Sequence, residues 1–589
     1  MNEESREKIV GSLCVSSLFG LTLFFFGPTQ IYFTNILEFT SSFAGLAPFF
    51  AGLSALCILL LTAGTAFLKS LVHRKAVSLL LALSLLLWIQ GNVLLWQYGP
   101  MDGREIDWSA NRLYGLIDGG VWIAMLLFAY RAAPHIARFA RRASAAFLMI
   151  QLVSTLIVAT TAVDATHLHE TLVEDEEAIF EFSPERNVVL LVLDQFQGDL
   201  YHEIINESLH YRDIVDGATY YRNALAAYPH TFASLAAIMT GRFYENSVPL
   251  QEFIKNSFSA NSVPRILKQN GYHVDLIGGG KDIYADETIA SNRTEIKHLV
   301  EQSTSPKEAA LVLDLTFFRH LPHFLKKHIY NNQMWLISSL SLRAVSGDFP
   351  AGRHRDTIRF IEKMAREARV SSEKPTFKYI HLMVPHMPIR FNERLEYVEL
   401  ANTRENFKEQ AKRTLNLVNM FLGRLKYIGV YDSTLIFIIA DHGAGGKVEI
   451  ALSGYEEADA PESEKIGDLV KGGALPLVLV KPFGATGGLR ISDAPVSLAD
   501  IAKTILFELE LDANVPGVSI FDIAESDTRS RRFFDHSWDA GDKQRYEPYL
   551  PPLKEYIVTG FSWLDASWQP THRVFTSEGV KSDTAQASQ

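Results

Sequence analysis

The residues of this chain that are best suited to do chemistry stand at the ends of apolar runs. Asp194 ends the run NVVLLVLD, and the pair Asp441-His442 ends the run STLIFIIADH. Neither run alternates polar and apolar positions, so we predict strands that are buried on both faces of a parallel sheet. Open α/β sheets place their sites at the carboxyl ends of such strands. Taken alone, Asp194 is explained equally well as a carboxylate that caps the next turn.

Thr231 begins a predicted short helix in the segment AAYPHTFASLAAIMTGR. Pro229 comes before this helix and Gly241 comes after it, which is the usual punctuation of helix ends. A threonine at a helix start is by default an N-cap. The alternative is a nucleophile whose alkoxide is favoured by the helix dipole and by a bound cation.

Asp194, Thr231, Asp441 and His442 together offer three oxygen ligands and one nitrogen ligand. Such a mixed set suits Zn²⁺ or Mn²⁺ better than Ca²⁺. We therefore predict one divalent metal, which would lower the pKa of the Thr231 hydroxyl and polarise a phosphoryl oxygen.

Four more side chains are candidates for the same region. His386 follows the apolar segment KYIHLMVP and is predicted to face the site, where it would contact the substrate or act as a proton donor. His381 alternates onto a strand face and is assigned a structural role. Arg242 and Lys281 are weaker candidates for contacts with an anionic substrate.

Five apolar segments are long enough to cross a bilayer as helices, at residues 9–27, 43–68, 76–97, 113–130 and 143–163. Basic residues gather in the N-terminus and in alternate loops: Arg6, Lys8, Lys69, Arg74, Lys75, Arg131, Arg138, Arg141 and Arg142. This charge pattern predicts a multi-pass membrane protein with a cytoplasmic N-terminus. Everything after residue 163 would then lie in the periplasm or outside the cell.

Polar residues in or near these spans suggest specific contacts. Asp118 lies inside the fourth span, where an ionisable group is costly, and it is either functional or close to interfacial water. Gln90 and Asn92 are predicted to bond between helices. The aromatic and basic stretch 313–336 is either a core-facing helix or an interfacial helix on the outer leaflet.

The 589 residues divide into four predicted parts. Residues 1–163 form a transmembrane domain, 164–186 an acidic linker, 187–575 an extracytoplasmic catalytic domain, and 576–589 a disordered tail. Further strands are expected at 273–280 and 474–482. The net charge of −11 argues against a nucleic-acid partner, and the two cysteines allow no disulfide framework in the catalytic domain.

A set of motifs occurs along the chain in the order NVVLLVLD, TFASLAAIMTGR, VPHMP, IIADHG and LPLVLVKP. In these motifs and in the order in which they occur, the chain resembles the alkaline phosphatase/sulfatase superfamily. The five preceding spans make the chain similar to its membrane-anchored phosphotransferases, such as lipoteichoic acid synthases and phosphoethanolamine transferases. The resemblance implies an α/β domain with a mostly parallel sheet covered by helices. It also implies Thr231 as nucleophile, Asp194, Asp441 and His442 as metal ligands, and His386 as a contact of the transferred group.

The chain departs from the superfamily in two places that bear on chemistry. Phe232, Ala233, Ser234 and Leu235 follow Thr231, so the conversion to formylglycine that true sulfatases require is not expected. Gln195 and Leu382 stand where sulfatases often have second acids, which favours one metal over two.

The resemblance therefore implies a protein of the bacterial cytoplasmic membrane that transfers a phospholipid headgroup, phosphoglycerol or phosphoethanolamine, to an envelope glycan or lipid. Two alternatives stay open. One is a phosphodiesterase or phosphatase that uses the same site with water. The other is a non-catalytic lipid-binding protein on the same fold.

Overall fold

The computed structural model describes the chain except for residues 1–2, 37–38, 40, 99–105, 107, 110, 169–174, 279–286, 301–305, 332–333, 339–351, 388, 390–399, 445–467, 538–544 and 583–589. The chain forms two compact units. Unit 1 comprises Met1–Glu170 and Glu301–Pro350, and unit 2 comprises Thr171–Val300 and Ala351–Gln589.

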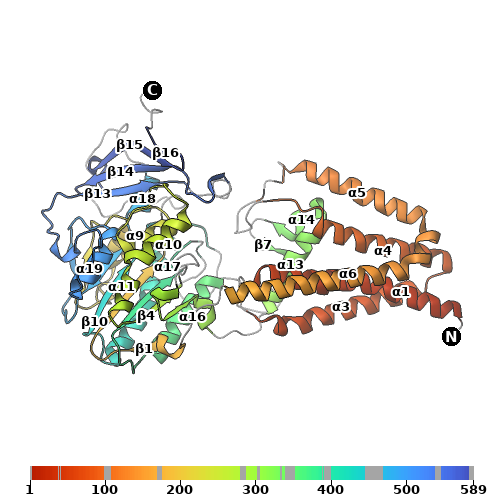
Figure 1. The fold of residues 1–589 in the computed structure, drawn as a ribbon, viewed down its shortest axis with the longest axis horizontal. Helices are drawn as coiled ribbons and strands as arrows, with labels where there is room; N and C mark the ends of the chain where they lie inside the picture. The colour runs from red at the N-terminus through yellow and green to blue at the C-terminus, as the bar shows by residue number, and fades with distance from the viewer. Residues whose placement is uncertain are drawn as a thin grey trace. The chain divides into compact units, whose positions relative to one another are not determined.

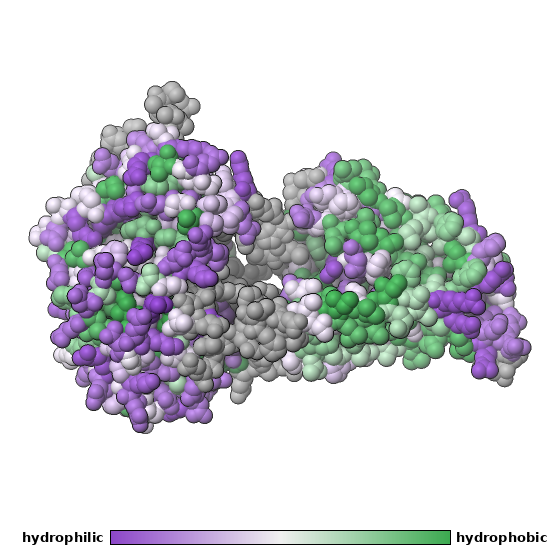
Figure 2. Space-filling model, viewed as in Figure 1, coloured by the Kyte–Doolittle hydropathy of each residue, from purple (hydrophilic) through white to green (hydrophobic). Residues whose placement is uncertain are grey.

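Unit 1 contains five helices that are long and apolar enough to cross a membrane. The first is continuous through α1 (Glu3–Leu21), a π-helical turn η1 (Thr22–Phe26) and α2 (Gly27–Thr34), and the others are α3 (Phe43–Ala66), α4 (Ser70–Asn92), α5 (Arg112–Arg131) and α6 (Ala133–Leu168). Hydrophobic residues cover the visible faces of these helices (Figure 2). Each predicted span falls on one of these helices, but the first and fifth helices extend beyond the predicted 9–27 and 143–163, to Glu3–Thr34 and Ala133–Leu168. The third span was placed about five residues too late, because apolar residues continue past the end of its helix at Asn92.

Unit 1 also includes a segment that the sequence assigned to the catalytic domain. The helices α13 (Pro306–His320) and α14 (His323–Ile329), with the short strands β6 (Tyr330–Asn331) and β7 (Met334–Trp335), belong to it (Figure 1). The domain prediction 187–575 was wrong here, since an amphipathic pattern does not say which partner covers the apolar face.

Three glycines of the membrane helices receive side chains of α13 and α14. A Cβ added at Gly91 would lie 2.4 Å from Cδ2 of His320, and one at Gly27 would lie 2.7 Å from Cγ2 of Thr316. A Cβ at Gly115 would lie 3.0 Å from the His323 ring. Small residues permit this close packing between helices. The segment is therefore packed into unit 1 by close fit.

Asp118 fixes α14 to the membrane helices. Its carboxylate is fully buried and accepts hydrogen bonds from Trp96 Nε1 at 2.8 Å, from Gln90 Nε2 at 3.1 Å and from the backbone N–H of His323 at 2.7 Å. Gln90 thus bonds between helices as predicted, whereas Asn92 donates to Trp88 O within its own helix. The carboxylate is satisfied by neutral donors, which gives Asp118 a structural role.

Unit 2 is built on an eight-stranded sheet with the order β12-β3-β11-β10-β2-β9-β4-β5. Its strands are β2 (Asn187–Leu193), β3 (Thr219–Tyr221), β4 (His273–Ile277), β5 (Asn292–Thr294), β9 (Thr376–Leu382), β10 (Thr434–Ile439), β11 (Val478–Lys481) and β12 (Arg490–Ser492). The central strands β10, β2, β9 and β4 are parallel and buried along their whole lengths or nearly so, as the unbroken apolar runs predicted.

Successive residues of β2 enter two cores. Val188, Leu190 and Val192 pack with the helices on one face, α9 (Thr231–Thr240), α10 (Leu250–Asn261), α11 (Val263–Gln269) and α19 (Ile501–Glu508). Val189 and Leu191 pack on the other face with α7 (Gly198–Glu207), α16 (Gly352–Glu367) and α17 (Arg404–Tyr427). Helices on both faces bury the sheet. Because the central strands are parallel, their carboxyl ends lie at one edge of the sheet.

Several features of unit 2 differ from the prediction. The strand expected at 474–482 is the shorter β11, because α18 (Asp468–Ala474) occupies the start of that segment. β11 is antiparallel to both β10 and β3, so it does not continue the parallel part of the sheet. The described residues of the expected linker 164–186 belong to the two units. The helix α6 runs to Leu168, and the turn η3 (Glu177–Phe180) and the strand β1 (Glu181–Phe182), which pairs with β8 (Arg369–Val370), belong to unit 2.

A second, four-stranded antiparallel sheet lies near the C-terminus (Figure 1). It consists of β13 (Ser530–Asp535), β14 (Leu553–Thr559), β15 (Trp568–Thr576) and β16 (Gly579–Ser582). The predicted disordered tail 576–589 is therefore wrong up to Ser582, and the rest of it lies outside the described residues. The polar residues of this segment suggested disorder, but they also suit β16, which is an exposed strand at the edge of the sheet.

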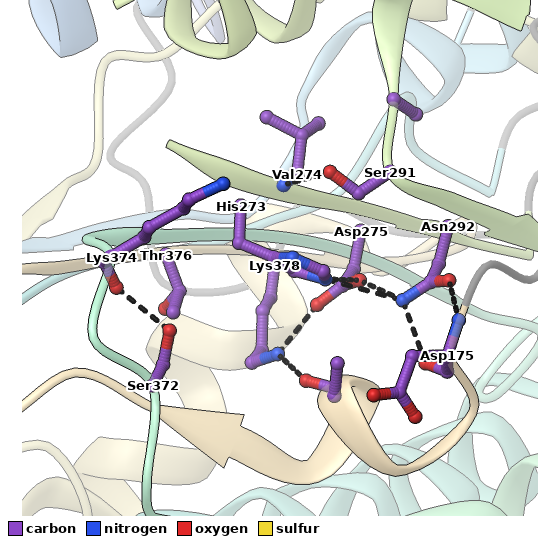
Figure 3. A network of polar contacts seen from close by, with 12 residues as sticks. Asp175, His273, Val274, Asp275, Ser291, Asn292, Ser372, Lys374, Thr376 and Lys378 are labelled. Atoms are coloured by element: carbon purple, nitrogen blue, oxygen red, sulfur yellow. Dashed lines mark hydrogen bonds and ion pairs between the residues drawn. The ribbon is translucent and has the colours of Figure 1, made fainter. Parts of the chain in front are cut away.

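A buried ion pair joins the start of unit 2 to its sheet (Figure 3). Lys378 Nζ lies 2.6 Å from Asp275 Oδ2 and donates to the Ala178 carbonyl at 3.2 Å, and both charged side chains are fully buried. Asn292 donates to Asp275 Oδ1 at 2.8 Å and to the Asp175 carbonyl at 3.0 Å. The network thus holds the chain that enters from unit 1 against three neighbouring strands.

We expect Lys378→Met to destabilise unit 2 by about 3–5 kcal/mol at neutral pH, because it leaves the Asp275 carboxylate buried without its partner. The measurement is the thermal unfolding midpoint of the full-length protein in detergent. Adding Asp275→Asn should restore most of the loss, and Lys374→Met, at an exposed position in the same region, should have little effect. A Lys378→Met protein as stable as the wild type would contradict this account.

The same pair predicts a pH dependence. Burial raises the pKa of Asp275, but the Lys378 charge and the bonds to His273 and Lys378 outweigh it and hold that pKa below its ordinary value. The pair therefore stabilises the fold above the unfolded pKa of about 4, and its contribution is lost as the pH falls through the lower folded value.

Candidate functional site

Two parallel strands of the sheet end in the predicted metal ligands. Asp194 follows β2 directly, and Asp441 and His442 follow the neighbouring β10 by two and three residues. One ligand atom from each of the three lies within 4.8 Å of the others, and all three residues are buried. The structure therefore brings together residues that are separated by about 250 positions in the chain, as their places at strand ends predicted.

The two carboxylates each present an oxygen with no hydrogen-bond partner. Asp194 Oδ1 and Asp441 Oδ2 are both buried and unbonded, and they lie 3.7 and 3.5 Å from His442 Nε2. Buried carboxylate oxygens without a partner are costly, so such oxygens point to a cation between them. Two carboxylates with one imidazole fit Zn²⁺ or Mn²⁺.

The orientation of His442 suits a metal ligand. Its Nδ1 lies 2.8 Å from the Gly443 carbonyl oxygen, to which it must donate its proton. Nε2 then carries a lone pair and faces the two carboxylates. A ring nitrogen fixed in this way by a backbone carbonyl is the usual arrangement at metal sites.

Thr231 faces the same point from the start of α9. Its Oγ1 lies 3.3 Å from His442 Nε2. His230, and not Thr231, holds the N-cap position, and no side chain caps the helix there. The N-cap explanation is therefore wrong, and the hydroxyl is directed at the ligand cluster at the positive end of the helix dipole.

His381 is closer to the site than its predicted structural role implied. Its Nε2 lies 3.2 Å from Asp194 Oδ2, and its Nδ1 lies 3.1 Å from the Tyr379 hydroxyl. Burial raises the pKa of Asp194, but His386, His381 and His442 outweigh it and hold that pKa well below its ordinary value. His381 thus orients one oxygen of Asp194 while the other remains unbonded.

Gln195 replaces the second acid of many sulfatases with a cross-link. Its backbone has a positive φ of 67°, its N–H donates to Asp441 Oδ1 at 3.2 Å, and its side-chain Oε1 accepts from Met387 N at 3.0 Å. Three loops are joined in this way. His386 is partly exposed and precedes Met387, so the Met387–Gln195 bond places it at the same edge of the sheet as Asp194.

Arg242, one of the two weaker candidates, is not brought to the site. Arg242 lies beyond the C-terminal end of α9, and the ten residues of that helix separate it from Thr231 by about 15 Å along the axis. The helix axis therefore separates Arg242 from Thr231, although the two residues are close in sequence, and its contact with substrate stays a prediction. Lys281 lies outside the described residues.

Two histidines near the cluster were not predicted. The ring centroid of His230 lies 6.0 Å from that of His442 and 4.9 Å from that of His536. His230 directly precedes Thr231, and this position in the sequence could have marked it as a residue near the site. His536 follows β13 of the second sheet, and no local pattern connects it with Thr231.

The family model described as Sulfatase matches residues 186–507, more than half of the chain. No curated protein matches the sequence.

Among solved structures, a protein of the alkaline phosphatase superfamily from Vibrio parahaemolyticus is similar at 15% identity, covering 69% of this chain and 83% of that chain, with a TM-score of 0.39. A phosphonate monoester hydrolase from Silicibacter pomeroyi is similar at 15% identity, covering 67% and 90%, with a TM-score of 0.39. The lipoteichoic acid synthase LtaP from Listeria monocytogenes is similar at 10% identity, covering 72% and 92%, with a TM-score of 0.35.

Proposed function

This chain belongs to the sulfatase family, and on that premise we propose that it is a metal-dependent phosphotransferase that acts on a membrane phospholipid. The donor would carry a phosphoglycerol or phosphoethanolamine headgroup, and the acceptor would be a hydroxyl of an envelope glycan or lipid. The observation that carries the proposal is the Thr231 hydroxyl, which faces His442 Nε2 at 3.3 Å beside two unbonded buried carboxylate oxygens.

Asp194, Asp441, His442 and Thr231 are the residues that would hold the metal. When bound, a divalent cation supplies charge that favours the alkoxide of Thr231 and polarises a phosphoryl oxygen. The sequence after Thr231 also fits attack by an unmodified hydroxyl. Phe232 and Ala233 follow Thr231, so it is not a substrate for formylglycine formation.

In the first step, Thr231 gives up its hydroxyl proton, and its Oγ1 forms a bond to the phosphorus of the donor while the bond from phosphorus to the diacylglycerol oxygen breaks. The leaving oxygen takes up a proton and departs as diacylglycerol. His386, partly exposed at the site edge, is the residue we assign to this proton or to a phosphoryl oxygen. The start of α9 stabilises the charge that develops near Thr231.

In the second step, a hydroxyl of the acceptor attacks the same phosphorus, and the bond to Thr231 Oγ1 breaks. The proton of the acceptor hydroxyl is transferred to a base, and the threonine is regenerated. Since unit 1 has five helices suited to a membrane, and its loop charges predict that unit 2 lies outside the cytoplasm, an outer-leaflet lipid is the donor we propose.

The test is an assay with a phospholipid donor labelled in its headgroup, using full-length protein in detergent with added Zn²⁺ or Mn²⁺. We expect diacylglycerol release that requires the metal, together with the label on an added envelope acceptor. Label found only as free headgroup phosphate would show a hydrolase instead. A protein that holds no metal and releases no diacylglycerol would favour the lipid-binding alternative.

A further inference from the structure

The turn between α13 and α14 carries an excess of positive charge at one end of the membrane helices. The sequence from Arg319 to His328 contains three lysines or arginines, three histidines and no acid. This end of unit 1 is where α4 ends and α5 begins, and the basic loops predict that it faces the outer leaflet.

The acids and one lysine of this region are already engaged. Asp118 accepts from three neutral N–H groups, and Asp314 accepts from the backbone of Ile337 and from the backbone and hydroxyl of Ser338. Lys326 is buried and donates to the carbonyl of Phe318 at the end of α13, where it caps the helix. The carboxylates of Asp118 and Asp314 therefore do not neutralise the charge of Arg319.

Arg319 is half-buried with only part of its guanidinium engaged. Its Nε donates to the carbonyl of Gly91 at 2.7 Å, in the last turn of α4. Among the residues that the structure describes, no carboxylate lies within ion-pair distance of it. Burial lowers its pKa, in keeping with a cation that lacks a counter-charge. Its two terminal nitrogens therefore form a fork without an anion, the geometry that matches a phosphate.

The surroundings of Arg319 are those of a lipid interface. Phe324 and Leu325 on α14 are 47% and 36% exposed, and Lys327 beside them is exposed as well. Aromatic residues that suit the headgroup level gather nearby: Tyr98, Trp108, Tyr114 and Trp335. Apolar side chains would enter the acyl region while the cations stay at the phosphates.

We propose that Arg319 and the basic α13–α14 turn bind the phosphate of an anionic phospholipid. The site lies wholly in unit 1 and requires no reaction at Thr231. The proposal thus goes beyond the proposed function, and either one can fail without the other. The plainer explanation, an arginine that only extends towards water, predicts no selective lipid binding.

The test is native mass spectrometry of full-length protein, delipidated in detergent and titrated with dioleoyl-phosphatidylglycerol. We expect Arg319→Gln, which keeps a donor for the Gly91 carbonyl, to weaken retention of the lipid about tenfold, and Arg319→Lys to weaken it less. Arg141→Gln is the matched control, because Arg141 is an exposed cation at the opposite end of the membrane helices. Its retention should equal that of the wild type.

Two arms on the wild-type protein do not depend on any variant. Dioleoyl-phosphatidylcholine should bind more weakly than phosphatidylglycerol, and millimolar inorganic phosphate should not displace the lipid. Displacement by inorganic phosphate would overturn the proposal and assign the fork to a free anion. Equal retention by Arg319→Gln and the wild type would overturn it as well.

Discussion

Replacing Thr231 by alanine is expected to reduce release of diacylglycerol from the donor by about a thousandfold or more, since loss of a nucleophile has effects of this order. The Thr231 hydroxyl points at His442 Nε2 and caps no helix, so its removal costs little in folding. The measurement is the initial rate of headgroup transfer by full-length protein at saturating metal.

Thr231→Ser is the matched variant, because it keeps the hydroxyl and removes only a methyl group. We expect it to retain measurable transfer, and we expect both variants to unfold at the temperature of the wild type. Transfer by Thr231→Ala at a rate close to that of the wild type would show that another group attacks the donor.

The second large effect concerns the metal. Asp441→Asn keeps an oxygen that can accept from Gln195 N and His442 N, but it removes the charge from the unbonded Oδ2. We expect metal affinity to fall by about a hundredfold or more, since a charged ligand is lost from a set of four. Transfer activity should fall with it.

The same substitution should raise the stability of the metal-free protein. Without a cation, Asp194 and Asp441 are two buried carboxylates whose unbonded oxygens cost about 1–3 kcal/mol each. An asparagine amide can donate where Oδ2 could not. In the presence of EDTA, Asp441→Asn should therefore unfold at a higher temperature than the wild type, and with excess metal the order should reverse.

Asp512→Asn serves as the control for this pair of measurements, since Asp512 is exposed in unit 2. Its metal content, determined by elemental mass spectrometry, and its unfolding temperature should match those of the wild type. If Asp441→Asn bound metal as well as the wild type did, the cluster would have some role other than metal binding.

Much of this site follows from the sequence because its ligands adjoin long apolar strands. β2 and β10 are recognisable as unbroken runs, and a parallel pair necessarily brings Asp194 and Asp441 to the same edge. Thr231 could be placed at a helix start for a similar local reason. The role of Thr231 could not be predicted, because an N-cap and a nucleophile have the same sequence pattern and differ only in the direction of the hydroxyl.

Features that depend on non-local packing were missed. The direction of β11 leaves no mark on its composition, because a strand buried on both faces has the same residues in either orientation. The amphipathic pattern of α13 is likewise the same whether its apolar face meets a protein core, a lipid surface or membrane helices. His536 comes from a sheet more than 300 residues away from Thr231 along the chain.

The most direct test of the central claim is to trap the intermediate. Full-length protein is mixed with metal and phospholipid donor without an acceptor, quenched in acid, digested and sequenced by mass spectrometry. We expect the mass of the phosphorylated headgroup on Thr231, and none in the Thr231→Ala protein. Turnover of the donor without a modified Thr231, or with the headgroup phosphate on another residue, would contradict the account.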